Sequence, residues 1–321
     1  GNYCFAGCTE LKSVEIPEGL GVIPYAAFQG CATLEKATLP ASLTMIEGMA
    51  FDQCPAVVIY GLLDTKAQEY AQDNNIAFEA TGAATYEGAV TDSMRWSYSD
   101  GVLTITGSGR MTDCSVNGGQ PWEKAYNGVK LQERIEKVVI GSGVENIGAY
   151  AFFHAENLST VVFDGESTLK SIDKHAFQGS GLIRMEMPDS ITELGNYVFA
   201  DCEELKEVSV STGVEAMPYA AFSGSSNLYK VILPASVQAF NSQVFEGCDR
   251  LMIICDEGSA AESYADAHDI PVIFTGSNAQ YGGKFGNGLR WEFENGELRI
   301  LGTGTMPEYE AEGEQPWKDA G

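Results

Sequence analysis

The chain has 321 residues and a formal net charge of -26, with 19 Lys and Arg against 45 Asp and Glu. This balance argues against nucleic acid as a partner, because phosphate binding needs clustered Lys and Arg. A hydrophobic content of 44% is ordinary for a folded chain. The sequence has no apolar run of about 18 residues and no signal pattern at its N-terminus, so we expect no membrane insertion within this segment.

Residues 1–57 repeat with a fixed period. Phe5, Phe28 and Phe51 lie 23 positions apart, and each of the first two is followed by a strand-like run, at 11–16 and 34–39. A period of about 20 to 29 residues indicates a solenoid of stacked coils. Alternation of apolar and polar residues within each run predicts a strand with one buried and one solvated face.

A short helix is predicted to close this first block. Asp64 is the expected N-cap, and Ala67, Tyr70 and Ala71 share one face of a helix near 64–74. The last coil of a solenoid otherwise exposes its apolar face, so we assign the helix as a cap. The first block with its cap covers 1–82.

Residues 86–135 have a different pattern. Apolar and polar residues alternate on both sides of Asp100-Gly101, which is a strong β-hairpin signal, and a Pro121-Trp122 pair follows. For the aromatic residues Trp96, Tyr98 and Trp122, packing between hairpin and solenoid is the favoured interpretation.

A second solenoid block covers 136–276. Its Phe199, Phe222 and Phe245 are again 23 positions apart, and Ser259 and Glu262 have the spacing of a capping box, which predicts a cap helix near 259–269. A truncated second hairpin segment follows at 281–321, with Asn295-Gly296 at its turn and Pro316-Trp317 after it.

The two blocks and the two hairpins recur at offsets of 194 and 195 positions. The repeating unit is therefore a hairpin, a solenoid and a helical cap. The sequence contains the tail of one unit, the whole of a second and the head of a third. We expect it to be part of a longer protein whose signal and anchor lie outside this segment.

The coil pattern has a Phe, a Cys three residues later and then a Leu-x-x-Val-x-Ile-Pro run. It resembles the BspA-type leucine-rich repeat of bacterial surface proteins over about 1–80 and 136–276. Ala155, Ser180 and Ser225 replace the Cys in three coils. With the patterns described above, the resemblance predicts a mostly β fold with short helices: two leucine-rich-repeat solenoid blocks, each with a helical C-terminal cap, joined by β-hairpin segments. It also implies an extracellular or bacterial cell-surface protein that binds other macromolecules.

Five of the eight cysteines occupy one repeat column, namely Cys8, Cys31, Cys54, Cys202 and Cys248. A small apolar thiol suits a tight corner, so buried free thiols are favoured, and a Cys8–Cys31 disulfide stays open as the alternative. The pair Cys4 and Cys8 has no second pair at zinc-ligand spacing, so no metal site is predicted.

Catalytic patterns are sparse. None of the three histidines, His154, His175 and His268, lies beside a candidate nucleophile in the sequence. Paired carboxylates could cut a glycosidic bond, but with 45 of them close pairs are expected by chance. We therefore expect no enzyme, no catalytic residue and no cofactor.

The outward positions of the strands are the candidate ligand-binding residues. In the second block they are Thr160, Val162, Arg184, Glu186, Glu207, Ser209, Lys230 and Ile232. Stacked strands form a flat, rigid surface of the kind that repeat proteins use for binding. The alternative is a solvated face with cross-strand charge pairs such as Arg184 and Glu207.

These observations favour a cell-surface or secreted adhesion module, monomeric, that binds an extracellular protein or glycan through the strand face. A passive spacer in a multidomain surface protein shares every feature seen in the sequence. A third possibility is the non-catalytic part of a glycan- or peptide-degrading enzyme.

Overall fold

The computed structural model describes residues 1–124, 128–275, 281–285 and 288–307. The chain forms two compact units, one of residues 1–105 with 119–139 and the other of 106–118 with 140–321. These units are defined by contacts within the structure and not by the sequence repeat. The division into two solenoid blocks and two hairpin segments therefore stays a prediction.

The first solenoid block has one row of parallel strands on each side of its core. The long row is ordered β1-β3-β5-β6 and the short row is β2-β4. The bounds are β1 Ser13–Glu15, β2 Val22–Ile23, β3 Lys36–Thr38, β4 Met45–Ile46, β5 Val58–Leu63, α1 Lys66–Asp73 and β6 Ala77–Ala83. Each strand pairs with the strand one repeat of 23 residues later, for example Val14 of β1 with Ala37 of β3, as the sequence predicts.

The hairpin around Asp100-Gly101 is confirmed. It lies in a sheet in which β10, β9, β8 and β7 are successive neighbours. Asp100 and Gly101 both have positive φ, at 50° and 75°, which is the backbone that a two-residue primed turn requires. The bounds are β7 Thr85–Thr91, β8 Met94–Ser99, β9 Val102–Gly107 and β10 Lys137–Ile140. Trp96, Tyr98 and Trp122 are all buried, in agreement with the core interpretation.

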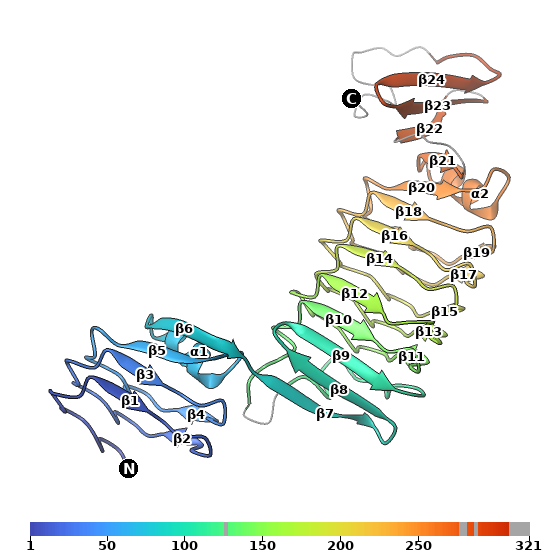
Figure 1. Ribbon diagram of the computed structural model, residues 1–321. Coiled ribbons are helices and arrows are strands. Elements are labelled where there is room, and N and C mark those ends of the chain that lie inside the picture. Colours follow the sequence, from blue (N-terminus) through green and yellow to red (C-terminus); the bar gives the residue numbers. More distant parts are fainter. Residues whose placement is uncertain (125–127, 276–280, 286–287, 308–321) are drawn as a thin grey trace. The chain divides into compact units, whose positions relative to one another are not determined.

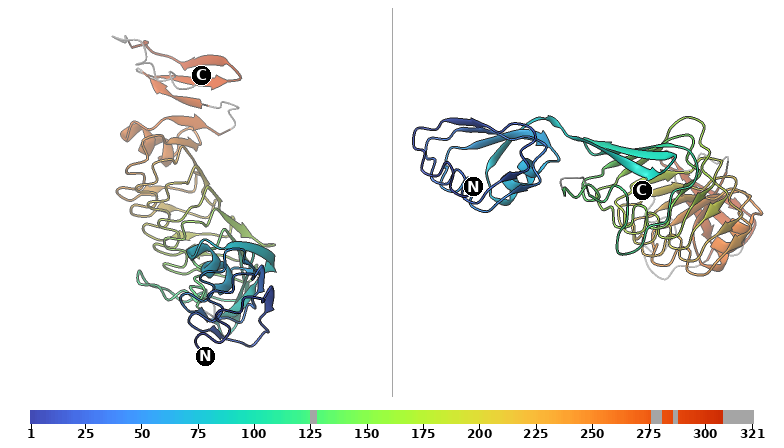
Figure 2. Two further views of the ribbon diagram at one scale, coloured as in Figure 1. Left: turned by 90° about the vertical axis from the view of Figure 1, so that its left-hand side faces the viewer. Right: turned by 90° about the horizontal axis from the view of Figure 1, so that it is seen from below.

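The second block repeats the two-row arrangement with more coils, and its coils lie one above the next (Figures 1 and 2). A five-stranded parallel sheet is ordered β14-β16-β18-β20-β21. The bounds are β11 Asn146–Ile147, β12 Thr160–Phe163, β13 Ser171–Ile172, β14 Arg184–Glu186, β15 Glu193–Leu194, β16 Glu207–Ser209, β17 Ala216–Met217, β18 Lys230–Ile232, β19 Ala239–Phe240, β20 Met252–Cys255, α2 Ala260–Ala267 and β21 Val272–Phe274.

A ladder of stacked phenylalanine rings fills one corner of every coil. In the second block neighbouring rings from Phe152 to Phe245 are 5.3 to 5.5 Å apart and within 13° of parallel. In each block a tyrosine of the cap helix meets the last ring edge-on at 6.0 Å, Tyr70 against Phe51 and Tyr264 against Phe245. The helices therefore cover the end of each core, as caps should.

The start of the first cap helix differs from the prediction. Its N-cap is Thr65, and Asp64 lies one residue earlier with a φ of 59°. The Asp64 side chain is drawn away from the helix because its carboxylate accepts hydrogen bonds from Arg134 and Tyr98. In the second helix Ser259 is the N-cap and its hydroxyl accepts from the Glu262 N–H at 3.2 Å, as predicted.

Arg134 joins two acidic residues at the first cap. Its guanidinium lies 3.1 Å from a carboxylate oxygen of Asp64 and 3.1 Å from one of Glu69. The Tyr98 hydroxyl donates to the other Asp64 oxygen at 2.9 Å. Burial, together with the Asp64 carboxylate, raises the pKa of Tyr98 well above its ordinary value. The network fixes the cap helix to the hairpin inside the first unit.

The second hairpin, β23 Leu289–Glu294 and β24 Glu297–Gly302, has Asn295-Gly296 at its turn, as predicted, and β22 Tyr281–Phe285 pairs antiparallel beside it. Pro316-Trp317 lies outside the described residues. In the part of the chain that the structure describes, neither α1 nor α2 nor any other helix is long and apolar enough to cross a membrane.

The cysteine column supplies hydrogen bonds between coils. The thiols of Cys31, Cys54, Cys202 and Cys248 each donate to the carbonyl of the ladder Phe in the preceding coil, at 3.1 to 3.2 Å. Ser225 makes the same bond to Phe199 at 2.8 Å, which explains why serine can replace cysteine in this column. These four cysteines are buried, whereas Cys4 and Cys8 are exposed.

We expect the buried column thiols to resist alkylation in the native protein. Burial raises the pKa of Cys202 to about 11 and that of Cys248 to about 12, so little reactive thiolate forms near neutral pH. Mass spectrometry after iodoacetamide treatment at pH 8 should find Cys4 and Cys8 modified and Cys202 and Cys248 unmodified until the chain is unfolded. Recovery of a Cys8–Cys31 bridge from protein made in an oxidising compartment would contradict free thiols in this column.

Candidate interaction surfaces

The strand face of the second block brings six of the eight predicted residues together. Glu207 pairs in register with Arg184 on one side and with Lys230 on the other, and Ser209 lies between Glu186 and Ile232 in the same way. Their side chains point outward because Met185, Val208 and Val231, which alternate with them, fill the core. We call these six residues, together with Ile183, Lys206 and Tyr229 directly before β14, β16 and β18, the strand face.

Charge pairing on the strand face centres on Glu207. Its carboxylate lies 3.1 Å from the Arg184 guanidinium and 3.9 Å from the Lys230 ammonium, and it accepts a hydrogen bond from the Tyr229 hydroxyl. The cross-strand pair that the sequence suggested is therefore present. Arg184 is nevertheless 58% exposed, so its outer side stays open to a ligand.

The two remaining predicted residues do not join this sheet. Thr160 and Val162 lie on β12, which forms no ladder with β14. The coil from Phe152 to Phe177 has 25 residues where the next has 22. Ile232 also differs from the prediction, because it is half-buried and not exposed. Val162 is exposed, at 37%.

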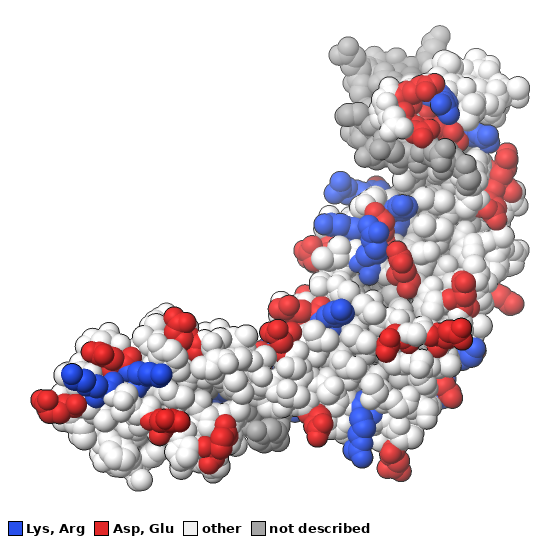
Figure 3. Space-filling view, viewed as in Figure 1, with Lys and Arg blue, Asp and Glu red and all other residues white. Residues whose placement is uncertain are grey.

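A second outward row was not predicted from the sequence. It contains the residue that follows each core leucine, namely Ile183, Lys206 and Tyr229, and all three are exposed, Ile183 at 44% and Tyr229 at 38%. Their position directly after Leu182, Leu205 and Leu228 was the available signal. Figure 3 shows Lys and Arg side chains gathered over this part of the solenoid, on a chain that is otherwise strongly acidic.

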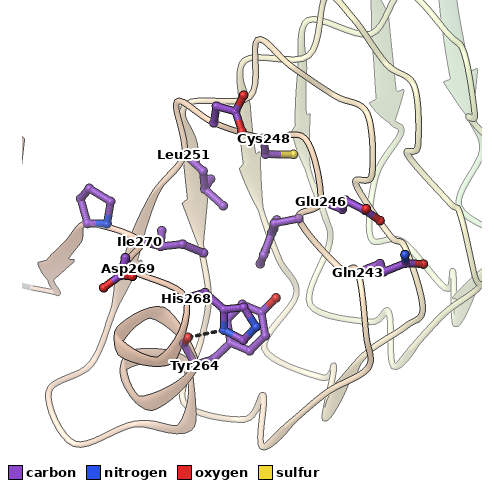
Figure 4. Close-up of a pocket in the computed structure, with 11 residues that line it drawn as sticks. Gln243, Glu246, Cys248, Leu251, Tyr264, His268, Asp269 and Ile270 are labelled. Carbon is purple, nitrogen blue, oxygen red and sulfur yellow. Dashed lines mark hydrogen bonds between the residues drawn. The ribbon is translucent and has the colours of Figure 1, made fainter.

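A groove recurs between the last coil and the cap helix of each block, and we call it the cap groove. In the second block it has a volume of about 490 Å³ and a floor of Phe245, Cys248, Leu251, Tyr264 and Ile270. Figure 4 shows Tyr264 and Ile270 on the helix side and Cys248 and Leu251 on the coil side.

The cap groove of the first block has a volume of about 600 Å³ and the equivalent floor of Phe51, Cys54, Val57, Tyr70 and Ile76. Each of these positions is 194 residues before its counterpart in the second block. The groove was not predicted from the sequence, because the helix and the coil that form it contribute only structural residues to the repeat pattern.

The three histidines pack against aromatic rings. His175 is stacked between Tyr150 and Tyr197 at 4.6 and 4.9 Å, and His268 is stacked on Tyr264 at 4.1 Å. The His154 ring meets Phe153 edge-on at 4.3 Å. These contacts give all three rings a packing role at coil corners and at the cap.

Similar solved structures are leucine-rich repeat proteins of bacteria. One from Eubacterium ventriosum has 22% identity and a TM-score of 0.47, and the match covers 68% of this chain and 48% of that one. One from Bacteroides ovatus has 19% identity and a TM-score of 0.34 over 77% and 48%. The pneumococcal vaccine antigen PcpA has 14% identity and a TM-score of 0.39 over 84% and 69%.

The matched region spans about half the length of the first two of these proteins. No curated protein matches the chain. The family model for the BspA type leucine rich repeat region matches six copies, in residues 1–63 and 127–252, which is more than half of the chain. Together with the stacked coils and their Phe and Cys columns, this match shows that the chain belongs to the BspA-type leucine-rich repeat family.

Proposed function

We propose that the chain is a non-catalytic interaction module of an extracellular or cell-surface protein, and that it binds a protein or glycan partner through the strand face. The observation that supports this most is the combination of exposed charge and exposed apolar side chains on one rigid sheet. Arg184, Lys206 and Lys230 lie beside Ile183 and Tyr229 there. Arginine and tyrosine are the residue types that contribute most often to binding energy at protein interfaces.

The fold family supports an interaction role, because leucine-rich repeats offer an extended surface that the core does not need. The non-catalytic part of the proposal draws on the second cap groove, where the His268 ring is stacked on Tyr264 and the Cys248 thiol donates to the Phe222 carbonyl. Two solenoid blocks in one chain would also allow weak individual contacts to add by avidity.

The test is a binding screen of extracellular proteins, by pull-down, and of glycans, on an array. The wild-type chain is compared with Arg184→Glu/Lys230→Glu, for which we expect about tenfold weaker binding, because both charges reverse on one surface. Arg184→Gln/Lys230→Gln serves as a second variant. It removes both positive charges without placing new negative charges beside the Glu207 carboxylate. Unchanged melting temperatures would show that the fold is intact.

The matched control is Lys130→Glu/Arg299→Glu, which makes the same change in net charge at two exposed positions outside the strand face. A double variant on the strand face that retains every ligand would contradict the proposed surface. Failure of the folded wild-type chain to bind any probe would favour the spacer function.

A further inference from the structure

The two solenoid blocks share the positions of their lysines but not those of their carboxylates. Residues 1–82 contain three Lys and no Arg. Two of these lysines recur as lysines 194 residues later, Lys12 as Lys206 and Lys36 as Lys230. The same stretch contains ten Asp and Glu, of which only two have an acidic counterpart at that offset. Positive charge therefore occurs at the same two places in both blocks, whereas negative charge is distributed differently in each.

In both blocks the two lysines are neighbours on adjacent coils. The Lys36 N–H donates to the Lys12 carbonyl at 3.2 Å, and the Lys230 N–H donates to the Lys206 carbonyl at the same distance. Lys12, Lys36 and Lys206 are exposed, and the Lys230 side chain is 31% exposed. Figure 3 shows Lys and Arg side chains over the strands of both blocks. We call Lys12 with Lys36, and Lys206 with Lys230, the lysine pairs.

Little of the charge on the lysine pairs is neutralised within the protein. Lys12, Lys36 and Lys206 form no ion pair with any residue that the structure describes. The Lys230 ammonium lies 3.9 Å from the Glu207 carboxylate, which is too long for a hydrogen bond. At physiological ionic strength the Debye length is about 8 Å, so the distant carboxylates of the acidic chain are screened. Each pair can therefore attract an anionic group that comes close to it.

The residues beside the lysine pairs favour a protein as the source of that anionic group. Each pair has a carboxylate next to it in the sequence, Glu35 before Lys36 and Glu207 after Lys206. A sulfated glycan carries charge along its whole length, so it would meet repulsion from these carboxylates. A protein can place single carboxylates opposite the lysines and neutral groups opposite Glu35 and Glu207.

Apolar and aromatic side chains also adjoin both pairs. The Tyr60 ring lies with its centroid 4.6 Å from the Lys36 ammonium. Tyr229, directly before Lys230, is 38% exposed, and Ile183, directly before the neighbouring strand β14, is 44% exposed. Such side chains add apolar contact area at interfaces between proteins. They suit a partner in which carboxylates alternate with apolar residues.

We infer that each lysine pair binds a protein segment that carries carboxylates next to apolar side chains, so the chain has one site of this kind in each block. The carboxylates of the partner lie against the lysines, and its apolar side chains lie against the neighbouring tyrosine. In the second block this inference rests on the function proposed for the strand face, and it narrows the partner to an acidic one. The site in the first block is additional to that function.

The experiment uses the full chain and the peptide acetyl-Leu-Asp-Glu-Leu-Asp-Glu-Leu-amide, with acetyl-Leu-Asn-Gln-Leu-Asn-Gln-Leu-amide as the neutral peptide. Each is titrated at about 0.15 M salt, and the chemical shifts of the backbone amides report each block separately. We expect the acidic peptide to bind about tenfold more tightly than the neutral one. It should shift the amides of 11–15 and 34–38 in the first block and of 205–209 and 228–232 in the second. At about 1 M salt the two peptides should bind alike.

Each block serves as the control for the other. Lys206→Gln/Lys230→Gln should remove the shifts in the second block and leave those in the first block unchanged. Lys12→Gln/Lys36→Gln should do the reverse. Glutamine is a long polar side chain on an exposed position, so we expect unchanged melting temperatures for both variants.

The charge-matched control is Lys170→Gln/Lys174→Gln. It removes two exposed lysines that flank β13, in the short strand row of the second block, and it alters net charge as the other double variants do. We expect this variant to bind the acidic peptide at both blocks as the wild type does.

Four results would overturn the inference. They are equal affinity for the two peptides, shifts confined to one block, a loss of affinity in the charge-matched control equal to that in the lysine-pair variants, and tighter binding of a heparin oligosaccharide than of the acidic peptide. Equal binding of both peptides at 205–209 and 228–232 would leave the strand face in place as a binding surface without a preference for acidic partners. No shift there with either peptide would count against the strand face itself.

Discussion

Replacement of Phe222 by alanine is expected to destabilise the second solenoid block by ~3 to 5 kcal/mol. The Phe222 ring is fully buried and stacked between Phe199 and Phe245, at 5.5 and 5.4 Å. Its removal leaves a cavity that the neighbouring coils cannot close, because their spacing is fixed by the strand ladders. Hydrogen exchange of the amides on β16, β18 and β20 measures the loss.

The control for this experiment is Phe5→Ala, in the same repeat column. Phe5 contacts a single ladder ring, Phe28, and is 50% exposed, so we expect a cost of only ~1 kcal/mol. Coils contact their neighbours only, so the damage from Phe222→Ala should leave the amides of the first block unchanged. Equal loss of protection in residues 1–80 would refute this independence.

The replacement of Arg134 by methionine is expected to destabilise the first unit by ~2 to 3 kcal/mol. The change leaves the Asp64 and Glu69 carboxylates close together without their shared cation. Breaking a fully buried pair typically costs ~3 to 5 kcal/mol. The estimate is lower here because these side chains remain 15 to 26% exposed and are partly screened by solvent. Urea unfolding followed at the buried Trp96 and Trp122 reports this change.

The matched control is Lys130→Met. Lys130 pairs with Glu133 at 2.7 Å, but both side chains are more than 60% exposed, so we expect little or no change in unfolding. A double-mutant cycle of Arg134→Met with Asp64→Asn should also show coupling, since the second change removes one of the stranded charges. If the two changes in unfolding free energy simply add, the interaction between Arg134 and Asp64 contributes nothing to stability beyond the separate residues.

A comparison of the repeats supports the importance of this network. The positions equivalent to Asp64, Glu69 and Tyr98 are Gly258, Ser263 and Phe293 in the next unit, so both carboxylates and the phenol hydroxyl are absent together. Loss of a single partner would leave a buried hydroxyl or carboxylate without its hydrogen bond, which is costly. The joint change indicates that the three residues act as a set.

Local pattern was sufficient to predict the solenoid. A Phe every 22 to 25 residues indicates stacked coils, alternation about Val14 and Val208 sets the buried face, and Asp100-Gly101 specifies the hairpin turn. These features depend on residues that are close in sequence or one repeat apart, so they can be predicted from the sequence period. The residue after each core leucine was overlooked because only the two positions that flank the central core residue of each strand were counted as outward.

The sequence by itself determined the coil, its core columns and the existence of both caps, because these follow from propensity and period. Only the tertiary structure decided where Asp64 directs its carboxylate, since Arg134 lies 70 residues away and no periodic rule connects them. It also decided that β12 stands apart from β14, and that cap helix and last coil enclose a groove. Those outcomes depend on contacts between elements that are far apart in the sequence, and the periodic pattern of residues does not specify such contacts.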